Sequence, residues 1–391
     1  MVVLLSDDQR ADTVTAEYMP NVWHDLVAGG SLFQDAFVPN PLCCPSRASI
    51  FTGNYSHTTG VWSNVTGEHG GLSAFAPSES STLATDFDGA GYRTLLVGKY
   101  INGYFPESMY VPPGWERWFA IGKSSRYYDY TVNVNGKKVR SYGGEPDDYI
   151  VRVQQARVLK FVERSGSSPF LLFWSFNAPH WQATADPRDV DRFEGETDSP
   201  AHDKMLDSAY SMDRAIGRLL DVLPPNTIVA YLSDNGFLWG ESKAGRGELR
   251  TKQWPYDESI RIPFILTALD GSVGSSDGIA LNVDLRETLG ALAGVSTPPT
   301  DGIDLRSESR SVFPIEHLVN SQKPQIPSYC GAREVGWMYV RYQDGVEELF
   351  REPDEVTNLI ADPANAGVLG RLRDEARTLC DPVPPGYSWT P

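Results

Sequence analysis

At residues 40–53 the chain reads Asn40-Pro41-Leu42-Cys43-Cys44-Pro45-Ser46-Arg47-Ala48-Ser49-Ile50-Phe51-Thr52-Gly53. Pro45 suits the first turn of a helix, so we expect a loop to end here and a helix to open after it. A reactive side chain just before that turn faces free backbone N–H groups and the positive end of the helix dipole, which favours anions. A cysteine beside an arginine at this place is a candidate nucleophile, and a buried turn is the alternative interpretation.

The composition is that of a soluble globular protein, with 41% hydrophobic and 22% charged residues among 391. This length exceeds what one core usually supports, so we expect one large domain and a smaller one. The formal net charge is −17. Such a charge disfavours broad binding of nucleic acid or another long polyanion, so an anionic substrate has to be held locally.

The chain contains no apolar run of 18 residues, so we expect no membrane helix and no membrane partner. No signal peptide is visible, because the sequence begins inside an apolar strand. Neighbouring Cys43 and Cys44 rarely bridge each other, whereas Cys330 and Cys380 can pair and close the last part of the chain. Such a bridge favours an oxidising compartment, so a secreted or periplasmic place is preferred over the cytoplasm.

Apolar runs alternate with segments of helical periodicity along most of the chain. We expect strands at residues 2–6, 32–37, 92–100, 170–176, 227–232 and 263–267. We expect helices at residues 20–28, 82–89, 147–164, 202–223, 283–292 and 364–379. This alternation predicts an α/β fold with a mostly parallel sheet and helices on both faces.

The remaining segments predict loops, hairpins and a domain boundary. Residues 54–62 and 71–80 are expected to be loops, residues 269–278 a Gly/Ser linker, and residues 130–139 a hairpin turning at Asn-Gly. From about residue 311 strands follow without long helices, and Asp344-Gly345 indicates another hairpin. We therefore expect a catalytic domain at residues 1–310 and a C-terminal α+β subdomain at residues 311–391.

Polar side chains follow the predicted strands where each strand ends. They are Asp7 and Asp8, Lys99, His180, and Asp234 with Asn235. Because the carboxyl ends of parallel strands share one edge of a sheet, we expect an active site there. For Asp7 and Asp8, the alternative is a capping pair for the next helix.

Asp7, Asp8, Asp234 and Asn235 form an all-oxygen set, which suits a hard cation such as Ca²⁺ or Mg²⁺. The cationic or proton-donating side chains expected at the same edge are Arg47, Lys99, His180 and Lys252. Together they describe a site that neutralises a tetrahedral oxyanion, so the predicted substrate is a phosphate or sulfate ester. Each basic residue alone is more often a surface side chain, and only the set indicates function.

The motif Cys43-x-Pro45-Ser46-Arg47, with residues 48–53 after it, resembles the signature of the type I sulfatases of the alkaline phosphatase superfamily. The other family landmarks occur in the same order: Ser6-Asp7-Asp8-Gln9, Gly98-Lys99, Ala178-Pro179-His180, Ser233-Asp234-Asn235-Gly236, Lys252 and the tail at residues 348–359. The resemblance implies an alkaline-phosphatase-like sheet and a smaller C-terminal subdomain of antiparallel strands with one helix. Residues 43–47 and 98–102 are most similar to the N-acetylglucosamine-6-sulfatases and related glycan 6-O-sulfatases.

The resemblance implies that a formylglycine-generating enzyme converts Cys43, not Cys44, to formylglycine. The hydrated aldehyde would bind one Ca²⁺ together with Asp7, Asp8, Asp234 and Asn235. One hydroxyl of the hydrate would attack sulfur, and deprotonation of the other would later release sulfate from a sulfated small molecule or glycan. The resemblance also implies roles for four basic side chains: Arg47 steadies the hydrate, Lys99 and Lys252 hold sulfate oxygens, and His180 contacts the sulfate or protonates the leaving alcohol.

The chain departs from the family pattern at Ile101, where many sulfatases carry a histidine, so the base for sulfate release is unassigned. His57 is a candidate, although a loop histidine is more often structural. Trp181, Trp239 and Tyr104 are candidate stacking faces for a sugar. Two other functions stay open: a phosphodiesterase or phosphonate monoester hydrolase on the same scaffold, and a non-catalytic sulfated-glycan-binding protein with unmatured Cys43.

Overall fold

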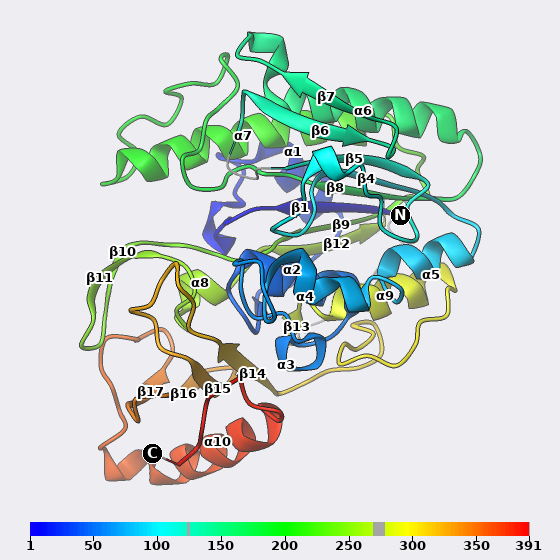
Figure 1. Cartoon of the computed structure of the whole chain (residues 1–391). Helices are drawn as coiled ribbons and strands as arrows, with labels where there is room; N and C mark the ends of the chain where they lie inside the picture. Colours follow the sequence, from blue (N-terminus) through cyan, green and yellow to red (C-terminus); the bar gives the residue numbers. More distant parts are fainter. Residues whose placement is uncertain (123–125, 269–277, 391) are drawn as a thin grey trace.

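The computed structural model describes residues 1–122, 126–268 and 278–390, so the predicted linker lies almost wholly outside the described residues. A nine-stranded sheet in the order β2-β12-β9-β1-β8-β4-β5-β6-β7 forms the body of the molecule (Figure 1). Its central strands, from β9 to β5, are parallel, and the strands on both flanks are antiparallel. The predicted mostly parallel α/β sheet is confirmed.

The strands of this sheet and of the two small pairs beside it are β1 (Val2–Ser6), β2 (Ser31–Leu32), β3 (Ala36–Phe37), β4 (Arg93–Lys99), β5 (Arg117–Ile121), β6 (Tyr130–Val134), β7 (Lys138–Tyr142), β8 (Phe170–Ser175), β9 (Ile228–Ser233), β10 (Leu238–Lys243), β11 (Gly247–Thr251), β12 (Phe264–Ala268) and β13 (Ala280–Leu281). The α-helices are α1 (Pro20–Val22), α2 (Cys43–Thr52), α3 (Ser56–Thr59), α4 (Gly71–Phe75), α5 (Leu83–Gly89), α6 (Ile150–Ser165), α7 (Pro200–Leu220), α8 (Asp257–Ile260), α9 (Asp284–Ala293) and α10 (Ala366–Leu379). A π-helical turn, Trp23–Val27, continues α1.

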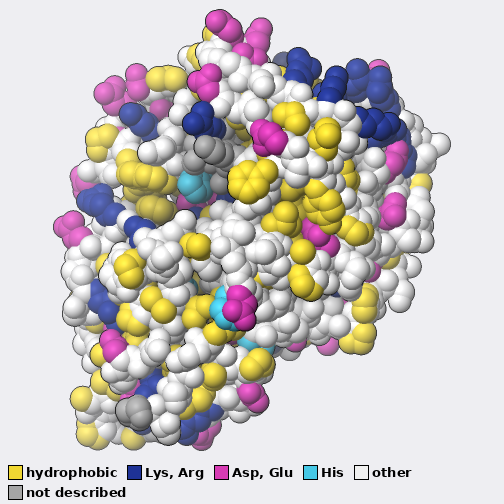
Figure 2. Space-filling model, viewed as in Figure 1, with side chains coloured by type: hydrophobic (Ala, Val, Ile, Leu, Met, Phe, Trp, Pro, Cys, Tyr) yellow, Lys and Arg dark blue, Asp and Glu magenta, His cyan; other side chains and the backbone are white. Residues whose placement is uncertain are grey.

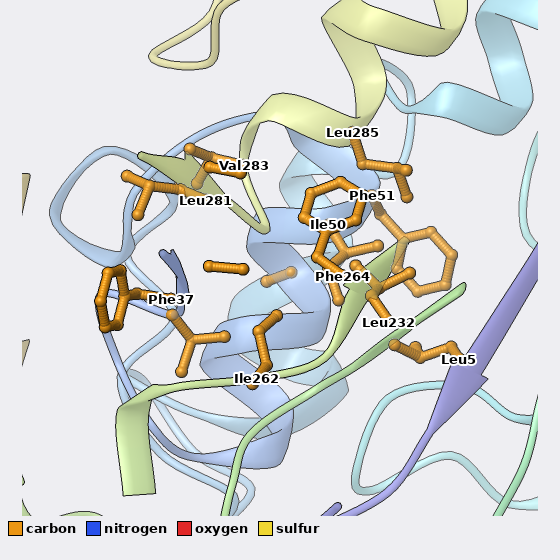
Figure 3. Packing of buried hydrophobic residues seen from close by; sticks show 14 of the residues in the cluster. Leu5, Phe37, Ile50, Phe51, Leu232, Ile262, Phe264, Leu281, Val283 and Leu285 are labelled. Carbon is orange, nitrogen blue, oxygen red and sulfur yellow. The ribbon is translucent and has the colours of Figure 1, made fainter. Parts of the chain in front are cut away.

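Helices cover both faces of the sheet. In Figure 1, α1, α6 and α7 lie on one face, and α2, α5 and α9 lie on the other. Strands β1 and β8 are buried along their whole length, as expected for central strands covered twice. Figure 3 shows the hydrophobic core between α2 and the sheet, where Ile50 and Phe51 of α2 point toward Leu5 and Leu232. None of the described helices is long and apolar enough to cross a bilayer.

Several local predictions were wrong. The expected strand at residues 32–37 is broken into β2 and β3, which pair with different neighbours. The expected loops at residues 54–62 and 71–80 contain the short helices α3 and α4. The sequence also gave no sign of β5 or of the hairpin β10–β11, whose alternation is interrupted by a bulge.

The C-terminal part forms a four-stranded antiparallel sheet packed on α10. Its strands are β14 (Val312–His317), β15 (Tyr329–Glu334), β16 (Trp337–Tyr342) and β17 (Glu347–Arg351), with the predicted hairpin between the last two. Phe313 of β14 stacks on Phe37 with ring centroids 5.0 Å apart, so this sheet shares a core with the main body. The domain boundary near residue 310 stays a prediction.

The bridge that the sequence allows between Cys330 and Cys380 is not formed. Both residues are free thiols, buried in one small cluster with Tyr387. Burial raises the pKa of both thiols above the usual range, which keeps them protonated. The sequence therefore correctly indicated that Cys330 and Cys380 lie close together. Because they form no disulfide, the structure does not support the inference of an oxidising compartment.

Gly98, next to Lys99, offers a test of how tightly β4 packs on β8. A Cβ atom there would lie 1.8 Å from the carbonyl oxygen of Ser175, and the φ of Gly98 is 112°. We expect Gly98→Ala to lower the free energy of unfolding by at least about 3 kcal/mol, because the two strands must separate. Urea titration measures this loss.

The matched control is Gly91→Ala, because Gly91 has φ 83° but open space around its Cβ position. Its expected cost is the left-handed backbone strain alone, about 1 kcal/mol. If Gly98→Ala and Gly91→Ala lost the same free energy of unfolding, the close packing of β4 on β8 would be contradicted.

Candidate active site

The first part of the site is the end of β1. Asp7 and Asp8 leave the strand fully buried, and Asp8 adopts a left-handed φ of 63°. The N–H of Asp7 donates to the carbonyl of Ala178 at 3.0 Å, and the N–H of Asp8 donates to Asp234 Oδ1 at 3.1 Å. The alternative of a helix-capping pair is wrong, because no side chain caps the following 3₁₀ turn.

Helix α2 begins at Cys43, whereas the sequence predicts a helix that opens after Pro45. Leu42 is its N-cap residue, and the N–H of Ser46 donates to the Leu42 carbonyl at 3.0 Å. Pro45 fits inside this first turn, because the N–H it lacks would have no partner within the helix. Cys43 therefore stands in the first turn of the helix itself, with its side chain in the site.

Arg47 lies inside the molecule and ties α2 to three strand ends. Its Nε donates to Asp234 Oδ2 at 2.7 Å, and its Nη1 donates to Ser175 Oγ at 2.6 Å. Its Nη2 lies 3.7 Å from Asp7 Oδ2. Burial lowers the pKa of Arg47, but the two carboxylates outweigh it and raise the pKa above its ordinary value.

Two buried lysines face the carboxylates. Lys99 Nζ donates to Asp7 Oδ2 at 2.6 Å and lies 3.8 Å from Asp234 Oδ2. Lys252 Nζ contacts Asp8 Oδ1 and lies 2.7 Å from Cys43 Sγ. Burial raises the carboxyl pKa values of Asp7 and Asp8, but the neighbouring cations hold them below the usual range. All these charges are therefore present together at neutral pH.

His180 and Asn235 complete the cluster. His180 Nε2 lies 3.6 Å from Asp8 Oδ2, and its Nδ1 is 3.0 Å from the Trp181 carbonyl. Burial lowers the pKa of His180, yet the charges of Asp8 and Asp7 raise it to about 9. Asn235 Nδ2 donates to Asp8 Oδ1 at 2.8 Å.

These residues open into a cavity of about 500 Å³. Its catalytic end is lined by Asp8, Cys43, His180 and Lys252. One wall is aromatic: Trp181 and Phe237 are parallel with centroids 6.3 Å apart, and Trp239 lies 4.6 Å from Phe237. The other wall is polar and is formed by Asn64, Asn102, Gln253, Gln322 and Lys323.

The structure brings together every residue predicted for the site. Two weaker candidates fall outside it. His57 Nδ1 is bonded to Glu316 at 2.8 Å and does not line the cavity. Tyr104 is buried in the core, where Trp118 Nε1 donates to its hydroxyl at 2.7 Å. Sequence reasoning missed Ser175 and Phe237, because Ser175 reads as part of the strand at residues 170–176 and Phe237 as an ordinary aromatic residue.

Part of the cluster is able to hold a metal ion. Asp7, Asp8, Cys43 and His180 each offer a ligand atom, and these atoms lie within 4.8 Å of one another. Asp8 Oδ2 and Asn235 Oδ1 are buried without a hydrogen-bond partner among the described residues. Buried polar atoms without a hydrogen bond are costly, so these two oxygens fit a bound cation.

Buried carboxylates and cations at the carboxyl edge of a parallel sheet form a site suited to binding an oxyanion ester. The chain belongs to the sulfatase family, whose model, Sulfatase, matches residues 1–295. It is 30% identical over 367 residues to a relative named as an extracellular sulfatase Sulf-1 homolog from Caenorhabditis elegans, covering 83% of this chain and 50% of the relative. It is 29% identical over 354 residues to the Homo sapiens N-acetylglucosamine-6-sulfatase, covering 78% of this chain and 63% of that protein.

The chain thus spans about half of the first relative and less than two thirds of the second. A solved structure described as a complex with its substrate D-glucosamine-2-N,6-O-disulfate superimposes with a TM-score of 0.79. The match covers 97% of each chain at 20% identity. At this identity the likeness establishes the fold alone, and it agrees with the alkaline-phosphatase-like architecture that the signature implies.

The ion pair of Arg47 and Asp234 is expected to carry much of the local stability. Arg47→Met leaves buried carboxylates uncompensated, so we expect a loss of about 3–5 kcal/mol in the free energy of unfolding. In the double variant Arg47→Met/Asp234→Asn the loss should fall short of the sum of the single losses by about 1–3 kcal/mol. Denaturant titration in a metal chelator measures all three variants.

Asp86→Asn is the control partner, because Asp86 pairs with Arg286 instead. Its loss should add to that of Arg47→Met within about 0.5 kcal/mol. If the loss in Arg47→Met/Asp234→Asn equalled the sum of the two single losses, Arg47 and Asp234 would not be energetically coupled.

Proposed function

We propose that this chain hydrolyses sulfate esters of a sulfated carbohydrate similar to N-acetylglucosamine 6-sulfate, using a formylglycine made from Cys43 and one Ca²⁺. The observation that carries the proposal is the place of Cys43. Its Sγ lies 2.7 Å from Lys252 Nζ and 3.7 Å from Asp7 Oδ1, at the catalytic end of the cavity. A nucleophile between a cation and a carboxylate cluster is suited to attack on an anionic ester.

The environments of the two cysteines support Cys43 as the matured residue. Cys43 lines the cavity, whereas Cys44 packs in the hydrophobic core. The N–H of Cys44 is bonded to Asn64 Oδ1 at 2.8 Å, and burial raises the pKa of its thiol to about 12. A hydrated aldehyde at position 43 supplies a hydroxyl nucleophile, and Cys44 serves as the spacer.

Asp7, Asp8, Asp234 and Asn235 would hold the Ca²⁺. All four offer oxygen atoms, the donors that Ca²⁺ prefers. Asp8 Oδ2 and Asn235 Oδ1, which accept no hydrogen bond from the described residues, fit this use. When bound, the ion supplies charge that polarises the nucleophile and the ester oxygens. Arg47 holds Asp234 and Asp7 in place from behind the cluster.

The remaining polar residues act on the substrate. Lys252 and Lys99 place two ammonium groups where sulfate oxygens would bind, which neutralises their charge. His180 faces the cavity and holds a proton for the leaving alcohol at Nε2. Ile101 is buried and carries no base, so sulfate release has no assigned base in the chain.

The aromatic wall supports a sugar as the leaving group. Trp181 follows His180 directly and is 46% exposed, so its ring is free to stack on the apolar face of a sugar. Asn64, Asn102 and Gln253 on the other wall are neutral hydrogen-bonding groups suited to hydroxyls and amides. The name N-acetylglucosamine-6-sulfatase among the relatives agrees with this choice. One relative is named as extracellular, which supports the proposed secreted or periplasmic place.

The first test is maturation. After coexpression with a formylglycine-generating enzyme, the peptide with residue 43 should show the mass loss expected for conversion of cysteine to formylglycine. Turnover of N-acetylglucosamine 6-sulfate should then appear and should fall at least about 10³-fold in Cys43→Ala, because the nucleophile is lost. Peptide mass spectrometry and sulfate release measure the two effects.

Cys44→Ala is the matched control, and it should keep both the modification and the turnover. Full activity with unmodified Cys43 would overturn the mechanism. Faster turnover of an aryl phosphodiester than of an aryl sulfate would favour the phosphodiesterase function. Binding of the sulfated sugar without turnover, despite modified Cys43, would favour a binding protein.

The second test is the metal. Ca²⁺ at about 100 times its Kd should stabilise the fold by about 2.7 kcal/mol, because it binds only the folded chain. Asp8→Asn should abolish this increment, whereas Asp304→Asn, at a carboxylate paired with Arg306 outside the cluster, should keep it. Thermal unfolding with and without a chelator measures the increment within each variant. If Ca²⁺ stabilised Asp8→Asn as much as the unsubstituted chain, Asp8 would not be a metal ligand.

A further inference from the structure

A second concave surface lies at the opposite edge of the main sheet. A cavity of about 160 Å³ opens between the first residues of β4 and β5 and the second half of α6. Five of its lining residues are cationic: Arg93, Arg117, Arg157, Lys160 and Arg164. We call the cavity that these five residues line the basic cavity. Figure 2 shows Lys and Arg side chains gathered on this side of the molecule, over the end of α6 and the β6–β7 hairpin of Figure 1.

Most of these charges have no acidic partner. Glu116 pairs with Arg93 at 3.0 Å and with Arg117 at 3.3 Å. In the described part of the chain, Arg157, Lys160 and Arg164 make no ion pair. Like charges repel, and the chain as a whole carries a net charge of −17, so this accumulation runs against the overall balance. Such an uncompensated group of cations indicates a place for an anionic ligand.

Two of the cations, Arg93 and Arg157, are held in position over apolar rings. Arg93 Nη1 donates to the Arg164 carbonyl at 2.8 Å, and its guanidinium lies 5.4 Å from the Phe161 ring. The Arg157 guanidinium lies 4.6 Å from the Phe119 ring. Fixed guanidinium groups lose little side-chain entropy on binding an oxyanion. Leu95, Trp118 and Val134 add apolar surface, which suits a ligand with carbon faces between its charges.

We propose that the basic cavity binds a second segment of a sulfated polysaccharide, while another segment of the same chain occupies the catalytic cavity. The identity of the ligand rests on the proposed function, because a sulfated glycan repeats sulfate groups on rings with apolar faces. A phosphate polymer shares the charge but lacks those faces. Binding at two sites raises the effective concentration of long substrates at the catalytic end.

The two sites are connected by one strand. Arg93 begins β4 in the basic cavity, and Lys99 ends β4 at the carboxylate cluster. At about 3.3 Å per residue the strand separates them by about 20 Å. Only a polymer can reach both, so the basic cavity distinguishes long substrates from single sugars.

The test uses the Cys43→Ala chain, which binds without turnover, and a fluorescent heparin octasaccharide as the probe. Lys160→Glu/Arg164→Glu should weaken binding at least tenfold and lower the slope of log Kd against log salt by about two, one for each lost cation. The matched control is Arg371→Glu/Arg377→Glu, which reverses the charge of two exposed arginines on α10. The control should change Kd less than twofold. Thermal unfolding checks that both variants are folded.

A second measurement uses the matured enzyme with Cys43 intact. The Lys160→Glu/Arg164→Glu pair should raise KM for the octasaccharide and leave kcat/KM for N-acetylglucosamine 6-sulfate unchanged. Equal loss of binding in the control pair would overturn the proposal, as would equal affinity for inorganic polyphosphate of matched charge. If no sulfated sugar were turned over, the proposed function would be contradicted. The binding experiment would still decide whether the basic cavity binds a sulfated polysaccharide.

Discussion

Three buried carboxylates set the constraint on which the rest of this structure depends. Asp7, Asp8 and Asp234 have essentially no exposed surface. Removing an ion from water costs several kcal/mol even in a real protein, so each carboxylate needs a cation within contact distance. Arg47 and the lysines at positions 99 and 252 provide this charge, and each comes from a different element. The cluster therefore fixes the relative positions of β1, β4, β9, α2 and the β10–β11 hairpin.

Placing Arg47 in the interior requires an unusual helix. All ten residues of α2 are buried, so the helix has no solvent face and its polar side chains all need partners. Arg47 is bonded to strand ends on one side, and Ser46 Oγ accepts from Asn282 Nδ2 at 2.8 Å on another. The core around α2 also includes Phe313 of the C-terminal sheet. Burial of the helix that carries Cys43 thus explains why a second sheet covers this side.

The C-terminal sheet also supports the site from a distance. Arg246, in the turn of the β10–β11 hairpin, lies between the rings of Trp254 and Tyr342, at 4.5 and 4.3 Å. It also contacts Glu348 at 2.9 Å. Lys252 follows the same hairpin, so these contacts with the second sheet hold the segment whose lysine contacts Asp8.

The sequence allowed the central strands and the site to be predicted, because both leave local signals. Asp7 and Asp234 follow uninterrupted apolar runs, and that pattern alone places them at one sheet edge. The β10–β11 hairpin was missed because a bulge between Trp239 and Glu241 breaks the alternation that marks a strand. Tyr104 was misplaced because the direction of an aromatic ring depends on its partners, here Trp118 and Asn133, and not on local sequence. Most of the features that could not be predicted depend on contacts between residues that are far apart in the sequence.

The basic cavity gives the negative charge of the chain a physical role. A body with a net charge of −17 repels a sulfated polymer from most of its surface, and this repulsion falls off within about 10 Å at ordinary salt. A chain held at the basic cavity by Arg157, Lys160 and Arg164 is attracted there and repelled elsewhere, so its path over the surface is restricted. Cations also line a cavity at the catalytic end, where Lys252 and His180 lie, and a third cavity, where all four arginines pair with aspartates. Charge distribution alone therefore favours a path that joins the two edges of the sheet, with Arg93 and Lys99 at the ends of one strand between them.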